Sequence, residues 1–185
     1  MKKEEELSLI KQIIDGEESL FNKFIIEYSP RVLSVVRGVL YNREDAEEIA
    51  QDVFVKAYFS LKSFRGDCSF STWLYRIAYN MAISKIRQKK GSFIQIDNLS
   101  IPDDRISASE KVNDQEELQK QLNILLEELS PSDRFMILSF YMHQKSIIEI
   151  AEITGMSESN VKVRLHRIKK RMSLMLKGKM EVSYG

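Results

Sequence analysis

The sequence predicts an all-α protein of two small helical domains joined by a flexible linker, with a helix-turn-helix in the C-terminal domain. Apolar residues recur at spacings of three and four along almost all of the 185 residues, which is the period of an amphipathic helix. Only 7 glycines and 3 prolines are present, too few for the turns of a β-sandwich or barrel. With 43% hydrophobic and 30% charged residues, the composition is that of a globular protein and excludes a disordered chain.

The N-terminal domain, residues 1–90, is expected to hold four helices. The apolar spacing places them near residues 5–15, 18–40, 43–62 and 70–90. A linker at 91–109 follows, because Gly91 and Ser92 open a stretch that also contains Pro102. This linker keeps several apolar residues, which indicates that it lies against its own domains or against a partner.

The C-terminal domain, residues 110–185, shows helices near 110–129, 131–143, 147–154 and 158–177. Ser146 and Glu149 have the spacing of a capping box, which predicts that a helix begins there. Gly155 ends that helix and Ser157 caps the next one, after a turn of about three residues. Two helices at this spacing are typical of a helix-turn-helix.

Charge is unevenly distributed, although the net charge is only +1. Residues 1–90 hold 15 basic and 13 acidic residues (+2), residues 91–130 hold 3 and 9 (−6), and residues 131–185 hold 10 and 5 (+5). The stretches 68–90 and 160–180 contain basic residues and no acid. Each is either a surface for a polyanion or a solvated basic face.

The second helix of the helix-turn-helix separates an apolar stripe from a polar arc. Val161, Leu165 and Ile168 fall in one narrow wedge at 100° per residue. The outward residues include Asn160, Lys162, Arg164, His166 and Arg167. Arginine reads guanine and asparagine reads adenine in the DNA major groove, so this arc is a candidate DNA-reading face; the alternative is a solvated basic helix.

A second candidate surface lies on the helix near 70–90. Arg76, Tyr79, Asn80 and Arg87 share one face, with Trp73 at its edge. Rings, an amide and cations together suit single-stranded nucleic acid, and the polar loop at 64–70 could hold an unstacked base. The alternative is that the aromatic residues are ordinary half-buried core.

The helix near 43–62 turns an acidic face outward, opposite a stripe of packed apolar residues. Glu47, Glu48, Gln51, Asp52 and Val55 lie on that face. Acidic residues do not attract DNA, so the face either binds a protein partner or is simply solvated.

Catalytic, metal and cofactor sites are not expected. Cys68, His143 and His166 are single and scattered, without the spacing of a metal site, phosphate loop or nucleophile elbow. A lone cysteine excludes an internal disulfide and suits a reducing cytoplasm. No apolar run approaches the roughly 18 residues of a membrane span, so neither export nor membrane insertion is expected.

From Leu7 to Lys177 the sequence resembles the extracytoplasmic-function (ECF) sigma factors of bacterial RNA polymerase. The run Asp45–Tyr58 resembles the family helix that docks on the clamp helices of the polymerase beta-prime subunit, and Ser63–Asp67 with Ser71–Asn80 resembles its promoter-melting region. Val161–Arg167 is similar to the family's recognition helix for the minus-thirty-five element, in a domain that also contacts the beta-subunit flap.

This resemblance implies three sets of binding residues. The implied polymerase contacts are Asp45, Glu48, Gln51, Asp52 and Val55. The implied minus-ten residues, with a loop that captures a flipped base, are Phe64, Arg65, Gly66, Asp67, Trp73, Arg76 and Asn80. The implied minus-thirty-five residues are Asn160, Lys162, Val163, Arg164, His166 and Arg167.

The chain also departs from the family pattern at two positions. Ser84 replaces a second asparagine that many members have four residues after Asn80, and Val163 stands where a small polar residue is common. Valine favours contact with a thymine methyl over a hydrogen bond, so the promoter sequence does not transfer from relatives.

The resemblance implies core polymerase and promoter DNA as partners, together with an anti-sigma factor. The alternatives are a stand-alone helix-turn-helix regulator, which leaves the N-terminal surfaces without a role, and an enzyme, for which no site is visible.

Overall fold

The computed structural model describes residues 3–93 and 122–183, with only the backbone described for 90–93 and 175–183. All regular structure in these ranges is helical, which confirms the predicted fold class. The elements are α1 (Lys3–Ile14), the 3-10 helix η1 (Glu18–Leu20), α2 (Phe21–Arg37), α3 (Arg43–Ser60), the 3-10 helix η2 (Leu61–Ser63), α4 (Phe70–Phe93), α6 (Pro131–Tyr141), α7 (Ile147–Thr154) and α8 (Glu158–Ser183). Residues 122–127 form a further helical segment before α6.

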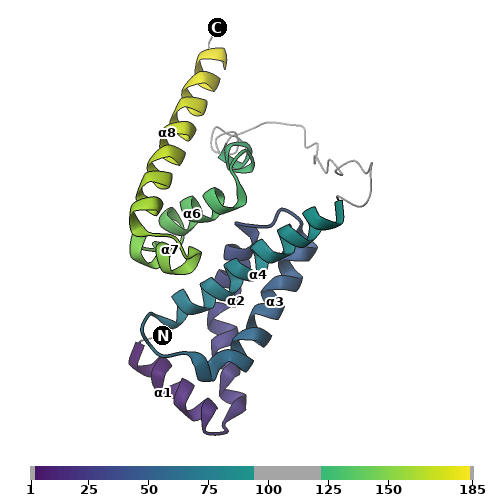
Figure 1. The fold of residues 1–185 in the computed structure, drawn as a ribbon, viewed down its shortest axis with the longest axis vertical. Coiled ribbons are helices and arrows are strands. Elements are labelled where there is room, and N and C mark those ends of the chain that lie inside the picture. Colours follow the sequence, from purple (N-terminus) through teal and green to yellow (C-terminus); the bar gives the residue numbers. More distant parts are fainter. Residues whose placement is uncertain (1–2, 94–121, 184–185) are drawn as a thin grey trace.

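Helices α2, α3 and α4 form the N-terminal unit, and α1 lies across one end of it (Figure 1). Its centre is aromatic: the rings of Phe24 and Phe70 lie 4.4 Å apart, and Phe70 contacts Trp73 at 5.6 Å. Helix α1 is attached through a buried hydrogen bond in which the Tyr28 hydroxyl donates to the Glu6 carboxylate. Burial, followed by this bond and the negative charge of Glu6, raises the pKa of Tyr28 well above its ordinary value.

Helices α6, α7 and α8 form the C-terminal unit. Phe135, Ile150 and Leu165 are buried in it, one from each helix. The expected capping box is present, since the Ser146 hydroxyl accepts from the Glu149 amide and the Glu149 carboxylate accepts from the Ser146 amide. Gly155 ends α7 with φ +71°, as the helix-turn-helix spacing predicted.

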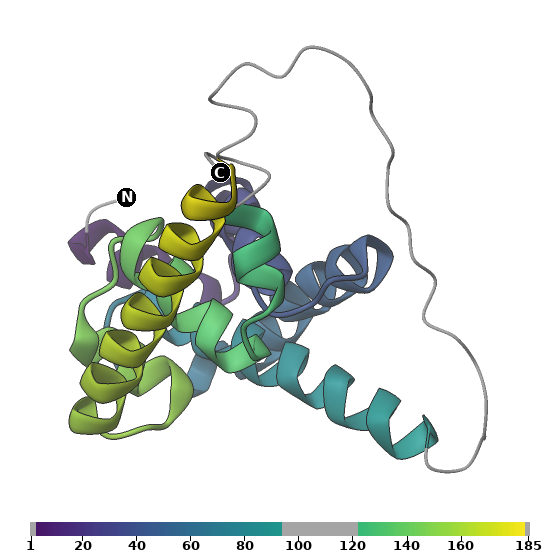
Figure 2. The same cartoon turned by 90° about the horizontal axis from the view of Figure 1, so that it is seen from above.

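The two units lie against each other. Helix α7 packs on α4, and α6 contacts the end of α2. Figure 1 shows α8 projecting beyond this contact, and Figure 2 shows the far end of α4 extending away from the C-terminal helices. Nearly all of the buried apolar residues therefore belong to one cluster that continues from one unit into the other.

Some helix boundaries differ from the expected ones. The first long helix is divided into η1 and α2, and α4 continues to Phe93, so Gly91 does not end it. A glycine inside a helix costs only about 1 kcal/mol relative to alanine, which neighbouring good helix formers can outweigh. The rest of the expected linker, 94–109, and residues 110–121 of the next helix lie outside the described residues. No described helix is both long and apolar enough to cross a bilayer.

Candidate nucleic-acid and protein interfaces

The loop between η2 and α4 encloses a small hollow of about 230 Å³. Gly66 has φ +78°, a left-handed backbone that glycine adopts without a Cβ penalty. Ser69 fixes the start of α4 because its hydroxyl accepts from the Thr72 amide at 3.2 Å. The hollow is lined by Ser63, Phe64, Arg65, Gly66, Asp67, Cys68, Trp73 and Arg76. A hollow with aromatic, cationic and carboxylate walls has the chemistry to hold a planar base.

Trp73 is more buried than its position on the helix suggested. The sequence placed it at the edge of an outward face, but only 6% of it is exposed. Phe64 and Phe70 pack on it at 5.4 and 5.6 Å, so its ring forms the inner wall of the loop hollow. An angular projection of one helix does not include the loop that folds back over it.

The outward face of α4 contains fewer rings than expected. Arg76, Asn80 and Arg87 are exposed as predicted. The prediction for Tyr79 is wrong: it is 5% exposed, and its ring packs on Phe135 of α6 at 4.6 Å. The exposed face of α4 is therefore polar and cationic, with the aromatic groups beside it and beneath it.

Ion pairs connect two basic residues of α4 to the acidic residues of α3. Lys85 lies 2.9 Å from Glu48 and 3.7 Å from Asp45, and Lys89 also pairs with Asp45. The hydrogen bond that the Lys85 ammonium donates to the Glu48 carboxylate is the main reason that the pKa of Lys85 is raised. Part of the predicted basic surface of α4 and part of the predicted acidic surface of α3 thus neutralise each other. Asp45 and Glu48 are therefore not simply solvated acids.

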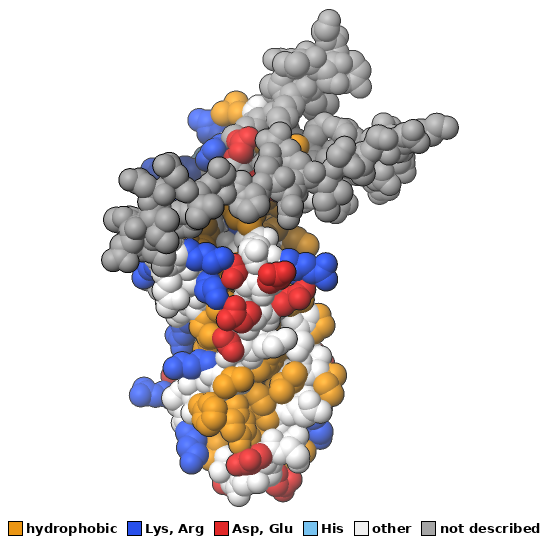
Figure 3. Space-filling view, turned by 90° about the vertical axis from the view of Figure 1, so that its right-hand side faces the viewer, with side chains coloured by type: hydrophobic (Ala, Val, Ile, Leu, Met, Phe, Trp, Pro, Cys, Tyr) orange, Lys and Arg blue, Asp and Glu red, His pale blue; other side chains and the backbone are white. Residues whose placement is uncertain are grey.

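The other side of α3 forms an open apolar groove with α2, of about 620 Å³. Its lining residues are Phe21, Ile25, Ser29, Leu33, Glu47, Ala50, Gln51, Phe54, Val55, Tyr58 and Phe59. Figure 3 views the side of the molecule that lies on the right in Figure 1 and shows a continuous apolar area with acidic side chains beside it. Phe59 is 79% exposed and Val55 is 55% exposed, so large apolar groups project at this groove.

The predicted contact residues of α3 divide between these two sides. Gln51 and Val55 line the groove, while Asp45 and Glu48 face the lysines of α4. Asp52 is exposed. The sequence analysis did not predict that Phe59 belongs to this surface. One signal was available: Phe59 is a large aromatic residue four positions after Val55 and lies outside the packed stripe.

Helix α8 presents the predicted reading face at its first turns. Val161, Leu165 and Ile168 are buried, as the stripe predicted. The Ser157 hydroxyl accepts from the Asn160 amide at 3.3 Å and fixes where the helix begins. The exposed residues of this face are Asn160, Lys162, Val163, His166 and Arg167.

Arg164 differs from the other residues of this face. Its guanidinium lies 2.7 Å from an Asp133 carboxylate oxygen on α6 and also donates to the Met156 sulfur. The side chain is 29% exposed. Arg164 therefore holds α8 against α6, whereas Arg167 remains exposed on the outward arc.

Within the described ranges, no group of three or more histidine, cysteine or acidic residues could hold a metal ion. The Cys68 thiol is half-buried in the loop, and burial raises its pKa, so it is a poor nucleophile. The described surfaces comprise a loop hollow, a cationic face on α4, an apolar groove and an exposed polar face on α8.

Comparison with known proteins matches the chain to two family profiles. Sigma-70 region 2 matches residues 24–91, and Sigma-70 region 4 matches residues 120–172. The ECF RNA polymerase sigma factor SigW of Bacillus subtilis is 32% identical over 167 residues, which cover 85% of this chain and 89% of that protein. The ECF RNA polymerase sigma-E factor of Escherichia coli K12 is 40% identical over 74 residues, 40% of this chain and 38% of that protein.

Solved structures with a similar fold cover nearly the whole chain. CnrH, in complex with the cytosolic domain of CnrY, aligns with a TM-score of 0.67 at 20% identity and covers 92% of this chain and 96% of that one. The sigma factor RpoE in complex with the anti-sigma factor NepR, from Bartonella quintana, aligns with a TM-score of 0.65 at 22% identity, covering 85% and 96%. These similarities show that the arrangement of helices is shared.

Proposed function

Because the chain belongs to the ECF sigma factors, which direct bacterial RNA polymerase to promoters, we propose that its two helical units divide promoter recognition between them. Residues 1–90 bind core polymerase and the minus-ten element, residues 110–185 bind the minus-thirty-five element, and 91–109 link the two. The observation that carries the proposal is the presence in one chain of an exposed apolar groove, a loop hollow beside a cationic face of α4, and a separate exposed polar face on α8.

The groove between α2 and α3 is the proposed contact with the clamp helices of the beta-prime subunit. Exposed Val55 and Phe59 offer the apolar anchors that dominate protein interfaces, and Gln51 offers a polar rim. Asp45 and Glu48 lie on the side of α3 that faces α4, where they remain paired with its lysines, and together with exposed Asp52 they complete the proposed contact set.

The loop hollow and the outward face of α4 are the proposed minus-ten site. A flipped base enters the hollow formed by Phe64, Arg65, Gly66 and Asp67, with Trp73 as its inner wall. Exposed Arg76 and Asn80 stabilise the separated strand by phosphate contacts and hydrogen bonds.

The first turns of α8 are the proposed minus-thirty-five reader. Asn160, Lys162, His166 and Arg167 reach base edges or phosphates, and Val163, which is 48% exposed, contacts a thymine methyl. Arg164 acts there indirectly, because its pair with Asp133 orients the recognition helix.

Four further assignments follow from this role. The C-terminal unit also contacts the beta flap, and an anti-sigma factor is the regulatory partner, in the way that the similar sigma factor RpoE forms a complex with the anti-sigma factor NepR. The chain acts in the cytoplasm, where polymerase works, and has no enzymatic activity of its own. The match to both sigma regions in one chain argues against a stand-alone helix-turn-helix regulator.

Run-off transcription with core polymerase over a promoter library tests this proposal. Added protein should give initiation at sites with two short conserved elements, and the double variant Val55→Ser/Phe59→Ser should lose both core binding and initiation. Both side chains are exposed, so helix content should not change. Ile148→Ser is the matched control, since it removes a 56% exposed apolar side chain from α7. Core binding by the double variant at wild-type affinity would contradict the assigned groove.

A further inference from the structure

Helix α1 contacts η2, the segment that leads into the loop hollow, although none of its described residues lines the hollow. One of its side chains reaches the loop itself. The Leu7 Cδ2 atom lies 3.5 Å from the position that a Cβ on Gly66 would occupy. Leu7 is 41% exposed and Gly66 has φ +78°, so an apolar group on the surface of α1 covers the left-handed turn of the loop.

A buried carboxylate fixes the position of α1 on the N-terminal unit. Glu6 is 6% exposed and accepts the hydrogen bond of the Tyr28 hydroxyl on α2. Ile10 and Ile13, on the same face of α1 as Glu6, are also buried. A buried carboxylate that loses its donor is costly, so this bond favours one position of α1 over others. Leu7 follows Glu6 directly, and the same bond therefore fixes Leu7 against the loop.

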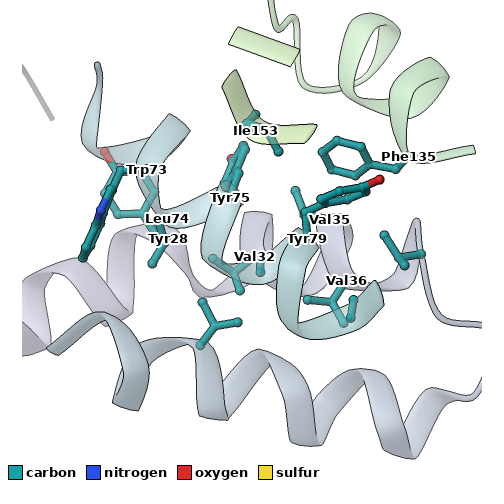
Figure 4. Packing of buried hydrophobic residues seen from close by; sticks show 14 of the residues in the cluster. Tyr28, Val32, Val35, Val36, Trp73, Leu74, Tyr75, Tyr79, Phe135 and Ile153 are labelled. Carbon is teal, nitrogen blue, oxygen red and sulfur yellow. The ribbon is translucent and has the colours of Figure 1, made fainter. Parts of the chain in front are cut away.

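The Tyr28 ring extends this support to the wall of the hollow. Its centre lies 5.6 Å from that of Phe70, and the Phe70 ring lies 5.7 Å from Phe64 and 5.6 Å from Trp73. Figure 4 shows Tyr28 and Trp73 at the same end of the buried cluster. Phe64 and Trp73 both line the hollow. Helix α1 thus supports the hollow in two ways: Leu7 contacts the loop, and the partner of Glu6 belongs to the aromatic cluster behind it.

Side-chain packing has to shape this loop, because its backbone forms few hydrogen bonds of its own. The backbone hydrogen bonds that flank it are donated by Phe64 and Trp73, whereas the described residues 65–68 form no backbone–backbone hydrogen bond. A segment of this kind opens at low free energy unless side chains hold it. A loop that already has the shape of its bound state binds a ligand without the entropic cost of ordering.

We propose that Glu6 and Leu7 are positioning residues for base capture, which hold the loop in the shape that accepts a flipped base without touching that base. The inference rests on the proposed minus-ten function of the hollow. Neither residue lines the groove between α2 and α3, so their loss should leave the binding of core polymerase unchanged. The effect of α1 should therefore appear in the contact with one base and not in assembly of the holoenzyme.

Binding of holoenzyme to a forked promoter duplex, with the minus-ten element single-stranded, tests this proposal. A series of forks has an abasic site at each position of the element in turn. For the wild type, the abasic position that lowers affinity most identifies the captured base. If the loop of Leu7→Ala holds the base-accepting shape for only roughly one-fifth of the time, its affinity for the intact fork falls about fivefold. Its affinity for the fork that lacks the captured base should equal that of the wild type.

A matched control separates the loop contact from the removal of a surface side chain. Ile14→Ala removes a 38% exposed apolar side chain from the same helix, about two turns from Leu7. It should bind both forks like the wild type. All variants should bind core polymerase with unchanged affinity, which a separate titration measures.

A second pair of variants tests the buried hydrogen bond. Tyr28→Phe keeps the ring but leaves the Glu6 carboxylate without its donor, so it should weaken binding of the intact fork as Leu7→Ala does. The double variant Glu6→Met/Tyr28→Phe replaces both polar partners with apolar groups of similar shape. It should restore affinity for the intact fork, because a hydrogen bond removed from both sides leaves no unpaired buried group.

Two results would overturn the inference. One is an affinity of Leu7→Ala for the intact fork equal to that of Ile14→Ala. The other is an equal loss on the intact fork and on the fork without the captured base, because such a loss would reflect folding and not base capture. A wild-type holoenzyme with no position sensitive to base removal would instead contradict the proposed function of the hollow, and with it the inference that rests on that function.

Discussion

Single side chains decide which residues of each face are available for recognition. Arg164 and Arg167 lie one turn apart on α8, yet the first pairs with Asp133 and the second is exposed. Sequence periodicity could place both on the outward arc but could not predict a partner on α6. The same limit applies to Tyr79. Its angular position on the helix was predicted correctly, but its packing against Phe135 of α6 could not be predicted.

Arg167→Ala should therefore weaken binding to the cognate minus-thirty-five element by about 1–3 kcal/mol and relax preference at one base pair. If Arg167 contacts a phosphate, affinity for all sequences falls alike and the salt slope flattens by about one unit. Titration against cognate and scrambled duplexes at several salt concentrations separates the two. Lys170→Ala serves as an exposed control on the same helix.

Trp73→Ala should lower the free energy of unfolding by about 3–5 kcal/mol, because the ring fills the space against Phe64 and Phe70. Asn80→Ala, at an exposed position on the same helix, should change it by less than about 0.5 kcal/mol. Urea denaturation measures both. A stable Trp73→Ala variant would mean that the ring does not support the loop.

At the scale of elements, local signals identified most helix limits. Ser146 with Glu149 and then Gly155 fixed the ends of α7, because capping bonds and left-handed backbone are local requirements. The apolar stripes of α3 and α8 were also readable, since one helical face must be buried. The end of α4 could not be predicted from the sequence, because a single glycine weakens a helix without ending it.

Gly155→Ala should destabilise the C-terminal unit by about 1–2 kcal/mol, the cost of a left-handed backbone for a residue with a Cβ. No atom lies within 4 Å of the added carbon, so steric clash does not contribute. Gly155→Asn should cost less, because asparagine tolerates this conformation. Urea unfolding curves compare the three proteins, and an alanine variant as stable as wild type would contradict the backbone argument.

At the scale of the whole molecule, the contact between units could not be predicted from the sequence. Tyr75 and Phe135 have the apolar character expected of any core residue, and nothing in their spacing tells which helix covers them. The roles of buried Arg134 and of Lys145, whose side chain is 10% exposed, were equally unpredictable, because most basic residues are solvated. The roles of these four residues depend on packing against helices that are distant in the sequence.

His143 should make this contact sensitive to pH. Burial, followed by the positive charges of Lys145 and Arg31, lowers its pKa below the ordinary 6.5. The Ser34 hydroxyl of α2 and the Tyr75 ring of α4 also face it. The contact favours neutral His143, so its stabilising contribution is fully present above pH 6.5 and falls as the pH drops below that value.

The free energy of unfolding, followed by urea denaturation from pH 7.5 to 5.5, measures this effect. Wild type should lose stability on acidification, and His143→Gln should reduce this loss because glutamine does not titrate. Glu149 does not titrate in this interval: burial raises its pKa, but hydrogen bonds from Lys145 and Ser146 prevail and bring it to about 2. An identical pH profile in both proteins would exclude His143 as the sensor.

The hydrogen bonds that the Arg134 guanidinium donates to the carbonyl oxygens of Gly38 and Val39 should make the contact between the units less sensitive to ionic strength than promoter binding. A guanidinium buried against neutral carbonyl oxygens gains little from screening ions, because no exposed charge pair is involved. Promoter binding releases counterions from DNA, so its affinity falls with a log-log slope of about −0.9 for each phosphate neutralised. A rise in salt concentration thus weakens the promoter complex and leaves the contact between the units intact.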